Sequence, residues 1–291
     1  MRKLFNGVCT ALVTPFKNGR IDFAAFGNLI ERQIEAGIDA LCILGTTGES
    51  STMSWEEKNA VIRFSWACVR HRVPVIYGIG GNNPVEIKRL GHAVRDLTEG
   101  LAAVMMTPPY YNKCTQDAAV LHFRDVSRAV GLPMVVYNIP GRTGMNLEPA
   151  TLARIARFKN IVAIKEASGS VAQIAEVVRV CPQIAVYCGD DGLSLPCYAV
   201  GCAGIISVAS NVRPTQTREI WEQRHRARAY KLFLAELPVY RALFCEVNPG
   251  PVKYALSLAK QCAAEVRAPL TTPSGANKKI IENHLDIARV R

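Results

Sequence analysis

A lysine at the end of an apolar stretch is the first residue in this sequence that could do chemistry. Residues 161–164 are all apolar and run directly into Lys165. An ammonium group in apolar surroundings is costly unless it is paired, so such a lysine is pushed toward its neutral form. A neutral amine can attack a ketone and form a Schiff base. A lysine that extends into solvent fits the same stretch, because most lysines are exposed.

A glycine-flanked turn with two hydroxyl groups follows another apolar stretch. It contains Thr46 and Thr47 between Gly45 and Gly48, with Glu49 directly after it. Such a turn can direct consecutive backbone N–H groups at a carboxylate, and threonine hydroxyls can relay protons. The alternative is a structural turn in which the two threonines satisfy backbone groups.

Aromatic and basic side chains follow two further apolar stretches. Tyr110 and Tyr111 come after a Pro-Pro pair and serve either as packing pieces or as phenol proton donors. Tyr137 ends another stretch, where a phenol can act as a general acid or base if a neighbour tunes its proton. Arg142, in the loop that follows, could clamp a carboxylate through two hydrogen bonds, although a loop arginine in solvent fits equally well.

The last two apolar stretches carry weaker signals. Gly189 follows one of them, and we expect Asp190 and Asp191 after it to cap the next helix. A metal site at these aspartates would lack further ligands. Ile206 lies in the last stretch, which we interpret as an apolar wall. No group of cysteines and histidines has zinc-binding spacing, so no metal site is predicted.

These residues need a scaffold in which the ends of several strands meet. Short apolar stretches alternate with segments of helical periodicity, and about eight such units within roughly 220 residues predict a (β/α)8 barrel. Its catalytic residues come from the carboxyl ends of the strands. An open doubly wound sheet is the alternative, but no G-x-G-x-x-G motif opens a helix after the first stretch. The predicted strands are 9–13, 40–44, 73–77, 102–106, 133–137, 161–165, 184–188 and 204–208.

End signals support several of the predicted helices. Asp22 precedes and Gly37 follows the first, and Ser54 with Glu57 forms a capping box at the second. Further helices are expected at 86–97, 117–130, 147–158, 171–180, 192–200 and 214–224. From residue 228 the pattern is helical, with Pro238 and the 248–251 segment as breaks. We therefore divide the chain into a catalytic barrel at 1–227 and a C-terminal region of two or three helices at 228–291.

Composition limits the class of protein. Hydrophobic residues make up 49% of the chain and charged residues 20%, which predicts a sizeable core. No apolar run is long enough to span a membrane, and we interpret the basic start at residues 1–3 as leading into the first strand, not as a signal peptide. Ten cysteines without a disulfide framework favour a reducing, cytoplasmic compartment. The net charge of +11 is spread over predicted helices, which argues against nucleic-acid binding.

In a barrel, the candidate reactive groups lie together at one mouth. Lys165, Tyr137, Arg142 and the Thr46–Thr47 turn then form a site for condensation with an α-keto acid. The turn would hold the carboxylate, Lys165 would attack the carbonyl, and Tyr137 would move protons. A hypothesis from a different class is a non-catalytic barrel that serves as a sensor or scaffold and forms no covalent adduct.

Several motifs in a fixed order resemble the dihydrodipicolinate synthase family. This family is one of the pyruvate-dependent class I aldolases, which include N-acetylneuraminate lyase. The resemblance runs from about residue 6 to the C-terminus. The motifs are Gly-Thr-Thr-Gly-Glu at 45–49, Tyr-Tyr-Asn at 110–112, Tyr-Asn-Ile-Pro-Gly-Arg-Thr-Gly at 137–144, Ile-Lys-Glu-Ala at 164–167, Gly-Asp-Asp at 189–191, Gly-Ile-Ile-Ser-Val at 204–208 and Asn-Pro-Gly-Pro-Val-Lys at 248–253.

The resemblance implies a role for each motif residue. Lys165 would form the Schiff base with pyruvate, and Tyr137, Thr47 and Tyr111 would form a proton relay, with Tyr111 reaching into a neighbouring subunit's site. No metal or organic cofactor would be needed. Thr46 and Thr47 would hold the pyruvate carboxylate, and Arg142 would hold the carboxylate of L-aspartate 4-semialdehyde. Gly189 and Ile206 would line the pocket wall.

The resemblance also implies the reaction and the assembly. Condensation of pyruvate with the semialdehyde would give 4-hydroxy-tetrahydrodipicolinate, the committed step of lysine and diaminopimelate biosynthesis, in a homotetramer built as a dimer of dimers. A related pyruvate aldolase or lyase that acts on a sugar acid or another aldehyde is the alternative. Sialic-acid lyases usually lack the Arg-Thr-Gly that begins at Arg142, which favours the synthase.

Departures from the family pattern concern regulation and subunit contacts. Members inhibited by lysine often carry histidines where this chain has Trp55 and Lys58. An added cation at Lys58 should disfavour a cationic ligand, so we expect weak or absent inhibition by lysine. Gly250 and Pro109 also depart from the family, which bears on subunit contacts and on the Tyr111 loop. Asn82, Glu86 and Tyr110 do match the family's possible allosteric pocket for lysine, and Ser50 and Ser51 lie where its loop would be.

Overall fold

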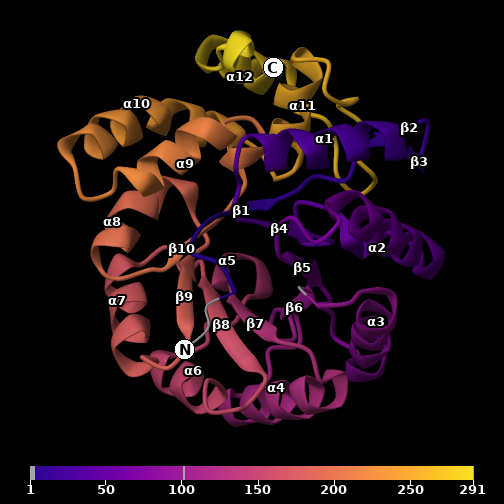
Figure 1. The fold of residues 1–291 in the computed structure, drawn as a ribbon, viewed down its shortest axis with the longest axis vertical. Coiled ribbons are helices and arrows are strands. Elements are labelled where there is room, and N and C mark those ends of the chain that lie inside the picture. The colour runs from indigo at the N-terminus through magenta and orange to yellow at the C-terminus, as the bar shows by residue number, and fades with distance from the viewer. Residues whose placement is uncertain (1–3, 101, 291) are drawn as a thin grey trace.

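Eight parallel strands close into a barrel, as the sequence predicts (Figure 1). The computed structural model describes residues 4–100 and 102–290, so the basic start at residues 1–3 lies outside the described residues. The barrel order is β1-β10-β9-β8-β7-β6-β5-β4, closed by pairing of β1 with β4. The strands are β1 (Gly7–Ala11), β4 (Ala40–Ile43), β5 (Val75–Gly78), β6 (Ala102–Met106), β7 (Met134–Asn138), β8 (Ile161–Glu166), β9 (Ala185–Cys188) and β10 (Gly204–Ser207).

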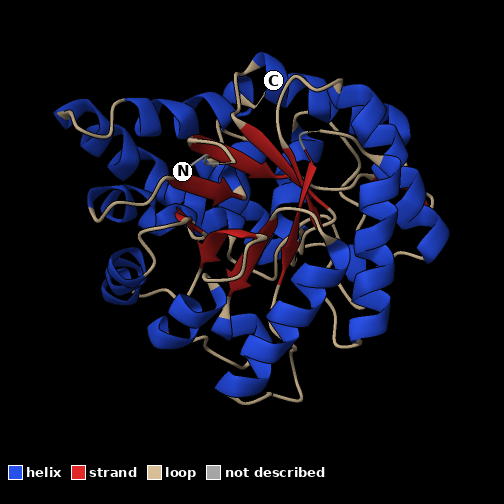
Figure 2. Cartoon of the chain, turned by 60° about the horizontal axis from the view of Figure 1, so that its bottom comes forward, coloured by secondary structure: helices blue, strands red, loops and turns tan. Residues whose placement is uncertain are grey.

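Helices surround the strands on the outside, as Figure 2 shows. The predicted caps are present: Asp22 accepts from Ala25 N, and Ser54 and Glu57 form the capping box of the second helix. These caps satisfy N–H groups that a helix start leaves unpaired. The barrel helices are α1 (Phe23–Glu35), α2 (Trp55–Val69), α3 (Pro84–Leu97), α4 (Gln116–Val130), α5 (Pro140–Thr143), α6 (Pro149–Ile155), α7 (Val171–Val180), α8 (Ser194–Ala199) and α9 (Pro214–Glu222).

Some local predictions were wrong. The first strand ends at Ala11, and the N–H of Val13 donates to the side chain of Asn211 and not to a neighbouring strand. A two-stranded hairpin, β2 (Phe16–Lys17) with β3 (Arg20–Ile21), was not anticipated. The predicted helix at 192–200 begins as a short 3-10 helix, Asp191–Leu193, before α8. The helix predicted at 147–158 is shorter, because Pro149 takes its first position.

The two aspartates after β9 have different roles. Asp190 caps the 3-10 helix by accepting from Gly192 N, as predicted. Asp191 instead turns inward, where its carboxylate accepts from Ser207 Oγ and from the N–H groups of Val208 and Ala209. Burial raises the pKa of Asp191, and these hydrogen bonds oppose the rise. Asp191 therefore fixes the end of β10.

The C-terminal region is helical, as predicted, and packs beside the barrel at the top of Figure 1. Its helices are α10 (Ala227–Leu243), α11 (Gly250–Leu258) and α12 (Gly275–His284). Pro238 lies inside α10 and does not end it, contrary to the prediction. Buried residues on both sides of the proline, including Phe233 and Tyr240, hold the helix together despite the missing N–H. The domain boundary at 227/228 stays a prediction.

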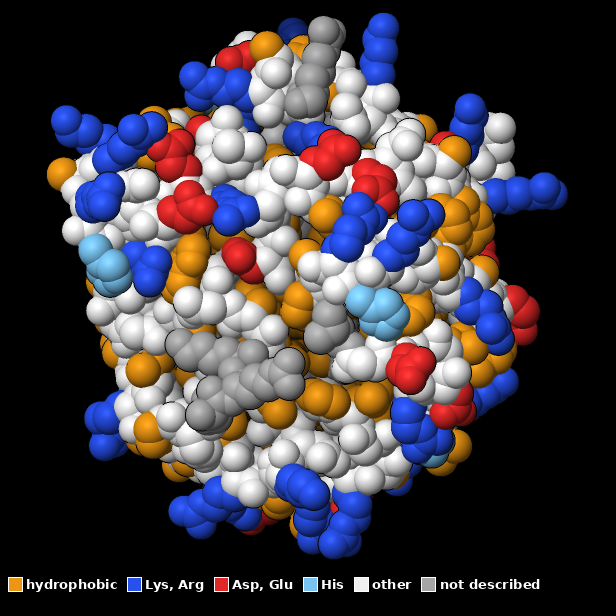
Figure 3. Space-filling view, in the orientation of Figure 1, with side chains coloured by type: hydrophobic (Ala, Val, Ile, Leu, Met, Phe, Trp, Pro, Cys, Tyr) orange, Lys and Arg blue, Asp and Glu red, His pale blue; other side chains and the backbone are white. Residues whose placement is uncertain are grey.

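Charged side chains are spread over the surface, and several thiols lie in the core. Figure 3 shows lysine and arginine side chains spread around this face with acidic groups between them. Basic side chains are most frequent at 224–231, where Arg228 pairs with Glu219 and Arg224 stacks on Trp221. Cys9, Cys42, Cys188 and Cys202 are free buried thiols, as expected. In the described part of the chain, no helix has the length and apolar character that crossing a membrane requires.

Candidate active site

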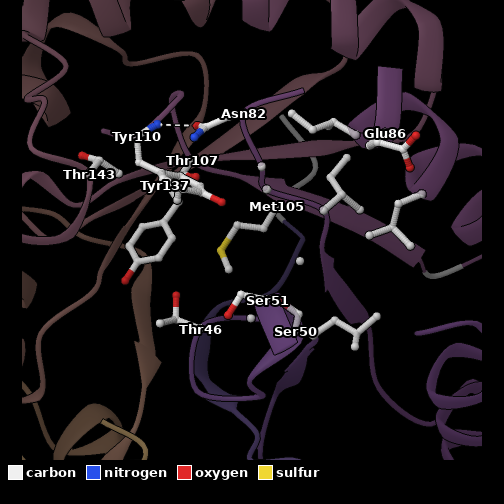
Figure 4. Close-up of a pocket in the computed structure, with 18 of the residues that line it drawn as sticks. Thr46, Ser50, Ser51, Asn82, Glu86, Met105, Thr107, Tyr110, Tyr137 and Thr143 are labelled. Atoms are coloured by element: carbon white, nitrogen blue, oxygen red, sulfur yellow. Dashed lines mark hydrogen bonds between the residues drawn. The ribbon is translucent and has the colours of Figure 1, made fainter. Parts of the chain in front are cut away.

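A cavity of about 530 Å³ opens at the carboxyl ends of β4, β5, β6 and β7 (Figure 4). Its walls include the loops that follow these strands, among them residues 44–46 and 78–83. Side chains from two predicted groups line it, the first being the catalytic and substrate-binding residues and the second the possible allosteric residues. They are Thr46, Tyr137 and Arg142 from the first group, and Ser50, Lys58, Asn82, Glu86 and Tyr110 from the second.

Lys165 lies on the inner face of β8, next to Tyr137 on β7. The two residues are register partners, and Lys165 Nζ lies 4.1 Å from the centre of the Tyr137 ring. Lys165 is only 5% exposed and Tyr137 only 6%. A side chain at Gly189 would stand 3.1 Å from Lys165 Cε and 2.7 Å from Ala167 Cβ, so the lysine needs a glycine there. The predicted strand-end lysine is thus buried and positioned, not extended into solvent.

Glu166 anchors the strand on the opposite face. Its buried carboxylate accepts from Asn138 Nδ2 at 3.0 Å and from Ser168 N at 2.8 Å. Burial raises the pKa of Glu166, while the hydrogen bonds from Asn138 and Ser168 lower it. Because β strands alternate faces, fixing Glu166 outward holds Lys165 inward. Sequence reasoning missed Glu166 and Asn138 as supports, although each directly follows a predicted catalytic residue.

The Thr46–Thr47 turn has the strained backbone that functional loops often carry. Leu44 before it and Glu49 after it both adopt left-handed conformations, with φ of 56° and 54°. Within the turn, Gly48 N donates to Gly45 O and Glu49 N donates to Thr46 O. The N–H groups of Thr46 and Thr47 take no part in these two hydrogen bonds. The turn can therefore present both to an anion.

The two threonines have different surroundings. Thr46 is exposed to the cavity, and Figure 4 shows its hydroxyl at the same end as the phenol of Tyr137. Thr47 is only 4% exposed, and its Oγ1 accepts from Asn248 Nδ2 at 2.9 Å. The sequence-based hypothesis gave the relay hydroxyl to Thr47. The geometry favours Thr46 as the hydroxyl that accompanies Tyr137, and Thr47 as a buried binding hydroxyl.

The C-terminal region braces this turn through a buried ion pair that the sequence did not reveal. Lys253 Nζ lies 2.5 Å from Glu49 Oε1, and both side chains are essentially inaccessible. Glu49 Oε2 accepts in addition from Arg267 N at 2.8 Å. Burial lowers the pKa of Lys253, and Glu49 opposes that shift. Two such charges are stable in the interior only as partners, so they fix α11 against the turn.

Arg142 lies at the rim of the cavity, on the short helix α5. Its Nη2 donates to the backbone carbonyl of Asn248 at 3.3 Å, and the side chain is otherwise exposed. A guanidinium offers five donors in a planar fork, so most of them stay available for a carboxylate. The guanidinium of Arg142 thus lines the same cavity as Tyr137 and Thr46.

The other end of the cavity is formed mainly by α2 and α3. Lys58 is half-buried, and burial lowers its pKa while Glu86 opposes that shift. Glu86 also pairs with Arg89 at 3.5 Å, and the Arg89 guanidinium covers the Trp55 ring at 3.9 Å. Asn82 Oδ1 accepts from Tyr110 N at 2.8 Å (Figure 4). Lys58 and Glu86 therefore line this end, and Glu86 is paired with Arg89, which is not part of the lining.

A family model described as the dihydrodipicolinate synthetase family matches residues 4–288. This chain belongs to that family. Curated relatives named 4-hydroxy-tetrahydrodipicolinate synthase agree. The protein of Trichlorobacter lovleyi is 44% identical over 283 residues, 96% of this chain and 97% of the relative. That of Geotalea uraniireducens is 45% identical over 282 residues, 94% of this chain and 96% of the relative.

Solved structures of the family have the same fold. Dihydrodipicolinate synthase of Thermotoga maritima matches with a TM-score of 0.95 and 37% identity, over 98% of this chain and 99% of the other. The enzyme of Cyanidioschyzon merolae with lysine bound matches with a TM-score of 0.94 and 35% identity, over all of both chains. A monomeric dihydrodipicolinate synthase variant matches with a TM-score of 0.95 and 36% identity, over 99% of this chain and 98% of the variant. The family does not by itself fix an oligomeric state.

Not every residue implied by the family resemblance lines the cavity, and the buried Lys165 and Thr47 are not part of its lining. Tyr111 is 87% exposed and left-handed, with φ of 68°, and its side chain is not part of the lining. Ile206 is a buried wall residue of β10. Gly189 is not part of the cavity lining and lies next to the Lys165 side chain. Among residues 4–100 and 102–290, no group of three or more histidine, cysteine or acidic side chains is arranged to hold a metal ion.

Proposed function

We propose that this protein is a 4-hydroxy-tetrahydrodipicolinate synthase that condenses pyruvate with L-aspartate 4-semialdehyde. The observation that carries the proposal is the buried Lys165, held against the Tyr137 ring at a barrel mouth where the Thr46–Thr47 turn and Arg142 offer two separate anion sites. A reaction that joins two carboxylate substrates through an amine nucleophile would use both anion sites and Lys165. The shared names of the relatives support the same substrates.

The first half of the reaction activates pyruvate. The Thr46–Thr47 turn holds the carboxylate, and Lys165 Nζ attacks the ketone carbon to give a carbinolamine. Loss of water, with the proton supplied through Tyr137 and Thr46, gives the Schiff base. Removal of a proton from the methyl carbon then gives the enamine. The amine, phenol, hydroxyl and guanidinium groups supply the nucleophile, the relay and the binding, so the proposal requires no metal or organic cofactor.

The second half forms the new carbon–carbon bond. Arg142 holds the carboxylate of the semialdehyde, and the enamine carbon attacks the aldehyde, whose oxygen takes a proton from the relay. The amino group of the same substrate then attacks the Schiff-base carbon and displaces Lys165 Nζ, which closes the ring and regenerates the free lysine. Gly189 and Ile206 form the wall beside Lys165.

The exposed Tyr111 favours action in an assembly. A phenol that extends into solvent on a strained loop has no role in its own cavity, whereas a second copy could receive it as a relay residue. We therefore propose a homotetramer, a dimer of dimers, in which Tyr111 completes a neighbour's site. Free buried thiols support a reducing, cytoplasmic location.

A related lyase acting on a sugar acid remains the second candidate. It would use the same Lys165 and Tyr137 but would have less use for a guanidinium that holds a short carboxylate substrate. The placement of Arg142 at the rim therefore favours the semialdehyde. A panel of aldehydes tested with pyruvate separates the two, because only the synthase prefers aspartate semialdehyde.

Borohydride trapping tests the covalent chemistry directly. Pyruvate plus reductant should add one reduced pyruvate unit to the protein, and peptide mapping should locate it at Lys165. The variant Lys165→Arg is the matched control and should remain unmodified. An unmodified Lys165 in the wild-type protein would rule out both the synthase and the lyase.

A further inference from the structure

We propose that Asn248 is a positioning residue that directs the Thr47 hydroxyl proton toward the pyruvate carboxylate. The inference rests on the proposed function and assigns a role to a residue that the mechanism above leaves unused. Asn248 lies in the C-terminal region just before α11, yet it is only 5% exposed, because its side chain reaches into the barrel mouth.

The hydrogen bond between these residues sets the direction of the Thr47 proton. Asn248 Nδ2 donates to Thr47 Oγ1 at 2.9 Å, and both groups are buried. A hydroxyl has one proton and can accept through its lone pairs. Since the oxygen already accepts from Asn248, the Thr47 proton is left for another acceptor. In the proposed site that acceptor is a carboxylate oxygen of pyruvate, held beside the N–H groups of the same turn.

Contacts of other groups hold Asn248 in place. Its backbone carbonyl accepts from Arg142 Nη2 at 3.3 Å. Lys253, on the following helix, pairs with Glu49 at 2.5 Å and donates to Glu265 O at 2.8 Å. These contacts involve neither atom of the Asn248 side-chain amide. The amide can therefore be changed while the segment remains attached to the turn.

Stability alone does not explain a buried amide at this position. Asn248 Oδ1 is buried and has no hydrogen-bond partner anywhere in residues 4–100 or 102–290. A half-satisfied amide in the interior costs folding free energy, which an apolar residue of similar size would avoid. Violations of this kind cluster at functional sites. The amide is thus accounted for by what its Nδ2 does at Thr47.

Steady-state kinetics with both substrates test the proposal. In Asn248→Ala, kcat/KM for pyruvate should fall about 10-fold, the effect of one lost hydrogen bond, while kcat/KM for aspartate semialdehyde stays unchanged. The matched control is Asn277→Ala, which removes another asparagine hydrogen bond of the C-terminal region, from Nδ2 to Glu246 at 2.6 Å. The control should change neither value. Equal falls for both substrates in Asn248→Ala would mean a merely structural role and overturn the proposal.

The isosteric variant Asn248→Asp tests the direction of the proton. An ionised carboxylate cannot donate and would accept the Thr47 proton, so pyruvate kcat/KM should fall more than in Asn248→Ala. As the pH is lowered, protonation restores a donor, and the ratio of variant to wild-type activity should rise. If this variant is as active as wild type above neutral pH, the amide accepts from Thr47 and the proposal is wrong. The variant keeps the shape of asparagine, so it serves if the alanine variant does not fold.

A double variant shows whether Asn248 acts through Thr47. In a Thr47→Val background, adding Asn248→Ala should cause no further loss in pyruvate kcat/KM. If Asn248→Ala lowers pyruvate kcat/KM by the same factor in the Thr47→Val background as in the wild-type protein, the proposal is contradicted. Wild-type protein that forms no adduct with pyruvate would instead defeat the proposed function itself. The two failures are therefore distinguishable.

Discussion

The two ends of the cavity beside Tyr137 are built in different ways. At the catalytic end, the buried strand residue Tyr137 lines the cavity with Lys165 buried beside its ring, and the Thr46–Thr47 turn is braced from the C-terminal region. At the other end, Lys58 is half-buried and Glu86 is exposed, and both belong to the surrounding helices α2 and α3. Strand ends fix side chains closely, whereas helix side chains at a rim can vary without disturbing the barrel.

The difference in charge matters as much as the difference in burial. The catalytic end offers an amine, a guanidinium and free N–H groups, which suit two carboxylate substrates. The other end presents Lys58 and Arg89 against one carboxylate, Glu86, which is already paired. The same cavity thus has one end tuned to a defined reaction and one end whose ligand depends on a few exchangeable side chains.

The largest expected effect comes from removing the nucleophile. Lys165→Ala should lower kcat by at least about a thousandfold, because no other amine replaces the Schiff base. A coupled assay of product formation measures this loss. The control is Lys58→Ala at the other end, which should keep most of the activity. Comparable losses in the two variants would break the distinction between the two ends.

The next effect concerns the brace at the catalytic end. Lys253→Met leaves Glu49 buried beside an apolar side chain and should cost about 3–5 kcal/mol of unfolding free energy. Chemical denaturation measures it. The exposed pair Arg154–Asp117 is the matched control, and Arg154→Ala should cost less than about 1 kcal/mol. The double variant Lys253→Met with Glu49→Gln should recover part of the loss. A cost for Lys253→Met as small as that of the control would show that the brace is not needed.

Arg142 comes third, because it acts on only one substrate. Arg142→Ala should lower kcat/KM for aspartate semialdehyde by about 10- to 100-fold, the value of charge-assisted hydrogen bonds, with pyruvate kcat/KM unchanged. Arg142→Lys should recover little, since a point charge lacks the planar fork. Arg128→Ala, at an exposed position on α4, is the control. If kcat/KM falls for pyruvate alone, Arg142 binds the pyruvate carboxylate and not that of the semialdehyde.

The strand-end residues were predictable because their surroundings are local. The stretch before Lys165 and the motif that begins at Tyr137 each indicate a strand that ends at a reactive side chain. Barrel closure then brings these ends together whatever the loops do. For the same reason, the eight strands were found to within a few residues. The hairpin β2–β3 was missed because strands of two residues leave no periodicity to detect.

The supports of the site could not be predicted, because they join distant parts of the chain. Lys253 and Glu49 are 204 residues apart, and Asn248 and Thr47 are 201 apart. The sequence shows these polar residues, but not which of them the fold brings together as partners. The different surroundings of Thr46 and Thr47 are equally invisible in a sequence where they are neighbours. Propensity and spacing locate reactive groups, but only packing shows which groups hold them.

The smallest effect concerns the second end of the cavity, where we expect millimolar lysine to inhibit weakly or not at all. Glu86 is already paired with Arg89, and the positive charge of Lys58 repels a cationic ligand. Removing that charge in Lys58→Ala should therefore strengthen inhibition by lysine about fivefold, the effect of roughly 1 kcal/mol of repulsion in a solvated cleft. Lys88→Ala on the same helix as Glu86, outside the cavity lining, is the control and should change nothing. Strong inhibition of the wild-type enzyme would show that exchangeable charges do not decide the ligand at this end.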